Sequence, residues 1–389
     1  MKRSRLGRRN GLPQEAEQLL WLASGLAESG SRAEDMFWDS RLGELVDSLL
    51  QAGDEEVLNA ALDHLFAANA GAHDALADAI ESRAESGAAD PSHRQALLIA
   101  APVLCWSRFS IPAATLSPGA LANLRVQLGA HVLADKVKLS LANVLFSPDQ
   151  LPQGYCETAR FTAELAQAAE RNQDLKIDPE TLPETARFLS DVRYLVGTVI
   201  AEAGAPIFRW QEKDISRELA ATQWRSQGGA CLSPLLAGCA TELVLPEAYF
   251  AACRQADRAS RPYSVRASVA FLATTLDIPP ARLRAVVAPF FDRQLEEYRI
   301  SFTALDNGNV MHGVVWPLLG AEDDNSDVPQ QIQQVLRDCG VNVILQLDQR
   351  FPMEYCDDCG SPMYPSPDGE AVHAELPEES AEQVPRHLH

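Results

Sequence analysis

The sequence has few basic residues and no long apolar run. Its 389 residues include 33 Lys and Arg against 54 Asp and Glu, which gives a formal net charge of −21. A general nucleic-acid binder carries a basic face, and anionic membranes attract basic surfaces, so this balance argues against both kinds of partner. No apolar stretch approaches the roughly 18 residues that span a bilayer. We expect no membrane contact.

The cysteines are scattered, and both ends of the chain lack structural patterns. Eight cysteines follow no regular spacing and no export signal precedes them, which is typical of reduced thiols in the cytoplasm. Residues 1–11 are basic without the apolar core of a signal peptide, and residues 366–389 are acidic; we expect disordered tails. The alternative for the basic tail is an arm that contacts an acidic partner or nucleic acid, with salt-dependent binding.

The sequence also lacks the short motifs that mark common enzymes. It contains no Gly-x-Ser-x-Gly, no His-Glu-x-x-His and no glycine-rich phosphate loop. We therefore expect a non-enzymatic binding or regulatory protein, with a protein or a small molecule as its partner. Enzymatic activity remains as an alternative only through a metal site.

Residues 12–92 show a helical pattern. Four stripes of leucine and other apolar residues recur at helical spacing, separated by Gly30, Gly53 and Gly71. Ser31 and Asp54 stand where helix N-caps are expected. These features predict a module of four antiparallel helices, a kind of module that is usually structural or protein-binding.

The rest of the chain predicts an α+β fold built from two tandem units. Residues 95–260 and 262–365 each fit a ferredoxin-like β-α-β-β-α-β order, a four-stranded sheet with two helices on one face. The first unit carries a helical insertion at 147–191. In the second, a strand at 265–274 and a helix at 279–294 are predicted to open the unit.

Two internal matches predict that the second unit is a duplicate of the first. Residues 135–142 and 296–303 agree in period and charge order, and residues 235–245 and 335–345 agree around a shared cysteine. The alternative is a single larger mixed sheet with the same element order.

The most specific local signal is Cys356-x-x-Cys359-Gly360. Two thiolates at this spacing can bind one Zn²⁺, and the glycine permits the tight turn that such a site needs. No second CxxC occurs, so other ligands must come from elsewhere, and His373, 14 residues after Cys359, is the strongest candidate. Further candidates are Cys339, Cys253, His312 and a residue of a partner subunit in a homo-oligomer.

Two other chemistries compete with a structural zinc at this pair. An open fourth position would make the site that of a zinc-dependent enzyme. The pair is otherwise two reduced, partly buried thiols. A thioredoxin-type redox pair fits poorly, because that CxxC opens a helix and the prolines after Gly360 prevent one.

Several stretches together resemble an uncharacterised bacterial family, the domain of unknown function 2863. The resemblance rests on residues 26–32, 101–108 and 147–152, and on the block Cys356-x-x-Cys-Gly-x-Pro-x-x-Pro followed by Gly369-Glu370. It covers nearly the whole chain, and the Cys-to-Pro block is its most specific part. The resemblance implies a proteobacterial cytosolic protein with no known activity, so it assigns no catalytic residue.

Overall fold

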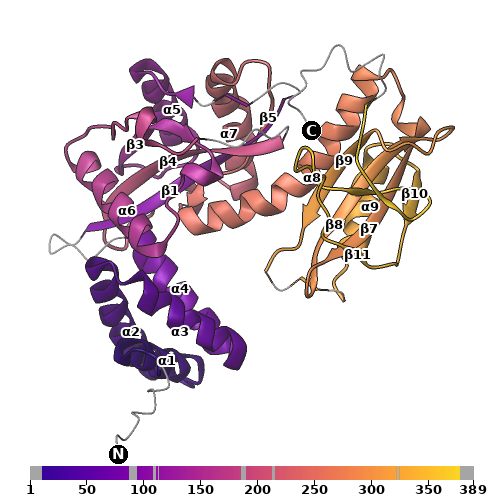
Figure 1. The fold of residues 1–389 in the computed structure, drawn as a ribbon. Helices are drawn as coiled ribbons and strands as arrows, with labels where there is room; N and C mark the ends of the chain where they lie inside the picture. Colours follow the sequence, from indigo (N-terminus) through magenta and orange to yellow (C-terminus); the bar gives the residue numbers. More distant parts are fainter. Residues whose placement is uncertain are drawn as a thin grey trace, which may run out of the picture.

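The computed structural model describes residues 11–86, 94–107, 111–112, 114–184, 190–212, 215–320, 322–323 and 325–376. The two tails expected to be disordered lie outside these residues, apart from Gly11 and 366–376. The described part is a mixed α and β fold with a helical N-terminal module and two separate larger sheets (Figure 1). No helix within it is both long and apolar enough to cross a membrane.

Four helices form the N-terminal module, as the leucine stripes predicted. They are α1 (Gln14–Ala27), α2 (Arg32–Ala52), α3 (Glu55–Ala68) and α4 (Ala70–Ser86). The Ser31 hydroxyl accepts a hydrogen bond from the amide of Glu34 and so caps α2, and Gly53 ends that helix with a φ of 78°. Leucines and alanines from all four helices share one core, which Cys156 of a later helix joins.

The first sheet has two long antiparallel strands at its centre. Its strand order is β2-β3-β4-β1-β5, all neighbours are antiparallel, and β6 also pairs with β1. The strands are β1 (Arg94–Trp106), β2 (Ala114–Thr115), β3 (Lys138–Phe146), β4 (Ser190–Glu202), β5 (Ala240–Leu243) and β6 (Glu247–Ala248).

Helices cover both faces of this sheet. Side chains of β1 such as Ile99 and Val103 pack with α5 (Pro118–His131) and α7 (Arg217–Leu232), whereas the alternate ones, such as Leu98 and Ala100, face α6 (Tyr155–Glu170) and α8 (Tyr249–Thr275). Burial on both faces explains why β1 is a continuous apolar run in the sequence. The main elements follow the order β-α-β-β-α-β, interrupted by α6, which lies in the predicted insertion.

The second sheet has a different order. Its strand order is β10-β7-β8-β9. Consecutive strands β7, β8 and β9 pair antiparallel, whereas β10 and β11 each pair parallel with β7. One face packs against the C-terminal half of α8 and against α9. The elements are β7 (Leu283–Phe291), β8 (Leu295–Ala304), β9 (His312–Pro317), α9 (Val328–Asp338), β10 (Val343–Gln346) and β11 (Phe351–Pro352).

Two predictions for this second unit are wrong. The predicted strand 265–274 is the C-terminal part of α8, where Val265, Val269 and Leu272 recur at helical spacing on the buried side. The predicted helix 279–294 contains a short 3₁₀ turn and the strand β7, whose valines and phenylalanines suit a strand. The unit therefore reads β-β-β-α-β after α8, and its element order does not repeat that of the first sheet.

Helix α8 connects the two sheets. Its N-terminal half packs on the first sheet and its C-terminal half on the second, so the boundary predicted near residue 261 falls inside one helix (Figure 1). Pro262 lies within the helix and removes one hydrogen bond of its ladder. Arg261 beside it donates to both carboxylate oxygens of Glu322, at 2.6 and 3.1 Å, which fixes α8 to the loop after β9.

Candidate metal centre

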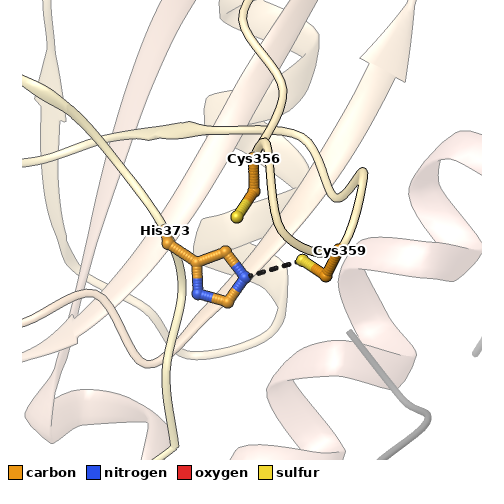
Figure 2. Close-up of side chains that lie close together, drawn as sticks. All are labelled: Cys356, Cys359 and His373. Atoms are coloured by element: carbon orange, nitrogen blue, oxygen red, sulfur yellow. Dashed lines mark hydrogen bonds between the residues drawn. The ribbon is translucent and has the colours of Figure 1, made fainter.

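Cys356, Cys359 and His373 come together at the surface of the second half of the molecule. Their sulfur and ring nitrogen atoms all lie within 4.8 Å of one another, and Cys359 Sγ is 3.3 Å from His373 Nε2 (Figure 2). The structure thus brings together the three residues that the sequence predicted as metal ligands.

A narrow hairpin presents the two cysteines. Tyr355 bridges to Pro362 across it, and the amide of Cys356 donates to the Ser361 carbonyl at 2.8 Å. Inside the hairpin the amide of Gly360 donates to the Cys356 carbonyl at 2.8 Å, and Gly360 has a φ of 73°. That backbone conformation favours glycine, so the residue after the second cysteine closes the turn that aims both thiols the same way.

A second hairpin returns the chain so that His373 reaches the thiols. Strand β12 (Tyr364–Pro365) pairs antiparallel with β13 (Ala371–Val372), and Gly369 turns the chain with a φ of 85°. Because Tyr364 pairs with Val372, His373 follows opposite Met363, next to the first hairpin. The site therefore depends on two consecutive turns, each with a glycine at positive φ.

Residues 353–376 are here called the strap. Its two hairpins lie on the face of the second sheet opposite α8 and α9, where Arg299 holds them. This side chain is fully buried on β8, and its Nη1 donates to the carbonyls of Glu354 and Met363, at 2.7 Å each. Its guanidinium carbon lies 4.2 Å from the centroid of Phe290 and 5.1 Å from that of Tyr355. Arg299 thus binds both strands of the cysteine hairpin at its base.

Two further contacts fix the strap. The hydroxyl of Ser301 donates to the Pro365 carbonyl, and the ring of Tyr364 lies directly against Gly313 of β9. A Cβ at Gly313 would be 2.2 Å from the Tyr364 ring, so only glycine leaves room for it.

The surroundings of the site favour a thiolate. The hydroxyl and amide of Ser361, then His373 and Cys356, lower the pKa of Cys359 to about 7 through hydrogen bonds. On the other side of the imidazole, a carboxylate oxygen of Glu375 lies 3.6 Å from His373 Nδ1. A carboxylate in this place is the usual outer partner of a metal-binding histidine.

The geometry fits a tetrahedral Zn²⁺. Ordinary Zn–S and Zn–N bonds place a sulfur and a nitrogen ligand about 3.6 Å apart, close to the 3.3 Å between Cys359 and His373. Two sulfurs and one imidazole nitrogen are a donor set typical of zinc.

The further candidates for a fourth ligand lie elsewhere, so the structure does not bring them to the cluster. Cys253 packs on the first sheet, Cys339 ends α9 beside the core of the second, and His312 Nε2 contacts the Ser268 hydroxyl at 3.0 Å. Among the described residues, the cluster consists of three ligands only.

Three supporting residues were missed in the sequence. Ser361 follows Cys359 by two residues, and Glu375 follows His373 by two residues. This closeness in the sequence was the signal that could have identified them. No feature of the sequence indicated the role of Arg299, because that role depends on which segment of the chain covers β8.

Comparison with known proteins identifies a family. Neither a search of curated proteins nor a search of solved structures found a match. The family model described as protein of unknown function (DUF2863) matches residues 4–387, which is nearly the whole chain and includes the Cys-to-Pro block. The chain therefore belongs to this family, as the resemblance predicted.

Proposed function

We propose that this protein is a non-enzymatic zinc-binding protein, in which Cys356, Cys359 and His373 hold one Zn²⁺. The observation that carries the proposal is the convergence of the three ligand atoms within 4.8 Å, from two hairpins that each need a glycine turn. The metal would link two parts of the strap, the hairpin at residues 355–362 and the chain after β13. A fourth ligand, water or a donor from another molecule, completes the tetrahedron.

The surroundings of the site support a structural role over catalysis. A catalytic zinc normally lies in a cavity that excludes water and carries further polar groups aimed at a substrate. Here Cys359 is exposed, and Asp357 and Asp358 beside it point into solvent. The buried contacts of Arg299 and Tyr364, by contrast, hold the strap against the sheet.

The rest of the fold supports a binding protein of the cytoplasm. The β-α-β-β-α-β order of the first sheet supports a ferredoxin-like unit, a fold that hosts many functions and so assigns none by itself. All eight cysteines are free, which supports a reducing compartment.

A measurement of zinc content tests the proposal directly. We expect about one zinc per chain in the purified, untagged protein and in a Cys231→Ser control, which changes a half-buried thiol on α7 far from the cluster. Cys356→Ser and His373→Ala should lose most of the metal while keeping the circular dichroism of the folded protein. A wild-type protein without zinc, or a Cys356→Ser variant that retains it fully, would refute the site.

One observation favours a zinc-dependent enzyme as the second candidate. Three protein ligands with an open position are the usual arrangement of catalytic zinc. Cobalt substitution separates the two functions, because tetrahedral Co²⁺ absorbs visibly and its spectrum responds to new ligands. An unchanged spectrum on addition of azide shows that the fourth position is closed and excludes the enzyme. A spectrum that shifts shows that a small ligand can enter the fourth position, as an enzyme requires.

A further inference from the structure

An aromatic surface at the junction of α1 and α2 is left uncovered. Trp21 is 58% exposed and Phe37 is 51% exposed, although both are large apolar side chains. Trp38 lies between them, with its ring centroid 5.1 Å from each and edge to face with both. The guanidinium carbon of Arg41 lies 5.9 Å from the Phe37 centroid. These four residues are called the aromatic patch.

Trp38, the central ring of the aromatic patch, is held from below. The ring of Trp38 lies on the backbone of α1 at Gly25, where a Cβ would be 2.7 Å from it. A ring fixed in this way loses little conformational freedom when a partner binds, and Trp21 and Phe37 both pack against it. Trp and Arg are also enriched at the positions that carry most of the binding energy of protein interfaces, and Phe is enriched in interfaces generally.

Acidic side chains surround the aromatic patch. Helical spacing places Glu17 one turn before Trp21, and Glu34 and Asp35 one turn before Phe37 and Trp38. All three are exposed. Residues 11–86 as a whole contain 16 Asp and Glu but only three Arg and no Lys, so the field around the aromatic patch is negative.

We propose that the aromatic patch is the docking site for a cationic amphipathic helix of another protein, which packs alongside α1 and α2 as an additional helix of the module. Its apolar side chains would cover Trp21 and Phe37, and its Lys and Arg would face the acidic rim. Charge complementarity selects this occupant. A second copy of the chain would place two acidic modules together, and an anionic membrane would repel the rim. The chain's own basic residues 1–10 offer only Met1 and Leu6 as apolar side chains, too few to cover the aromatic patch.

The experiment titrates the full-length protein with a fluorescently labelled helical peptide of leucine and lysine, its leucines at i, i+3 and i+4 spacing. Trp21→Ala and Phe37→Ala should each weaken binding at least about tenfold, as substitutions at interface hot spots do. The matched control is Phe66→Ala, which removes an aromatic ring that is 77% exposed on α3. It should change the affinity less than about twofold. Binding should also weaken as salt is raised.

Each other outcome would overturn the proposal. Equal weakening by Phe66→Ala, or equal binding of a leucine and glutamate peptide, would show that the aromatic patch does not select a cationic helix. Peptide binding that appears only after deletion of residues 1–10 would assign the aromatic patch to the chain's own segment. A dimer in light scattering that Trp21→Ala dissociates would assign it to a second copy. None of these readouts depends on zinc, so the two proposals fail or stand separately.

Discussion

A single glycine decides how closely the strap approaches the second sheet. Gly313 on β9 lies beneath the ring of Tyr364, and a Cβ there would be 2.2 Å from Cε1 of that ring. Gly313→Ala should therefore push Tyr364 away and destabilise the protein by about 1–3 kcal/mol, the usual cost of overpacking. Urea unfolding measures the loss. We expect weaker zinc retention as well, since Tyr364 immediately follows the cysteine hairpin.

Gly308→Ala is the matched control for this substitution. No atom lies within 4 Å of a Cβ at Gly308, in the loop between β8 and β9. Alanine should be tolerated there, and it restricts the unfolded chain more than glycine does. A Gly313→Ala protein as stable as Gly308→Ala would show that the Tyr364 contact does not hold the strap.

At the scale of single residues, the sequence predicted which side chains converge better than it predicted the residues that support them. Cys356, Cys359 and His373 were predictable because their donor atoms and spacing are local properties of the chain. Arg299 was not, because in the sequence it is one charged residue in an alternating strand. Only the covering strap buries it and gives it two carbonyl partners.

Helix α8 begins against a carboxylate of the helical module. Glu85 of α4 accepts a hydrogen bond from the amide of Phe250 at 3.1 Å, in the first turn of α8. Burial raises the pKa of Glu85 to about 7, with Glu81 adding to the rise while the Phe250 amide and Arg254 oppose it. The folded protein therefore holds a proton that the unfolded chain releases at lower pH.

The sign of the pH effect follows from this raised pKa. The contribution of Glu85 is fully present below about pH 4.5 and is lost as the pH rises through about 7. Glu85→Gln keeps the acceptor oxygen and removes the charge, so we expect it to be more stable than wild type at pH 8 by about 3 kcal/mol. At pH 4 the difference should vanish. Chemical unfolding across this range tests both expectations.

Glu56→Gln serves as the control, because Glu56 is an exposed residue in the first turn of α3. Its stability should follow the wild-type pH profile. A Glu85→Gln variant that also follows that profile would show that the buried carboxylate does not titrate with folding.

Whole elements were predictable where one signal dominated. The four helices α1 to α4 were expected from their leucine stripes and are found there. The errors are the strand predicted at 265–274, which is helix, and the helix predicted at 279–294, which is mostly strand. Pro262 is inside α8, which tolerates it because two sheets bury the helix along its length.

At the scale of the molecule, the spacing of apolar residues in the sequence did not predict how the helical module packs against the first sheet. The insertion helix α6 belongs to two cores at once, since Leu165 faces the first sheet while Cys156 faces the helical module. Glu55 of α3 links these parts, because its carboxylate accepts hydrogen bonds from the amides of Tyr155 and Cys156 at 2.9 and 2.8 Å. Such a connection between segments about 100 residues apart depends on tertiary packing, which local spacing does not encode.

The organisation into two sheets joined by one helix predicts that zinc removal acts locally. The metal would tie only the two hairpins of the strap, whereas β1 and β4 are paired along 13 residues each and buried between helices. A ligand bound at about 1,000 times its Kd stabilises what it binds by about 4 kcal/mol, so its loss should open the strap first. Hydrogen exchange measures this region by region. After chelation, the amides of Cys356, Gly360 and Met363 should exchange at least about tenfold faster, and those of β1 and β4 should not change. If zinc leaves without any loss of protection in the strap, the metal does not fasten it. If β1 and β4 lose protection equally, the site stabilises the whole fold and the local model is wrong.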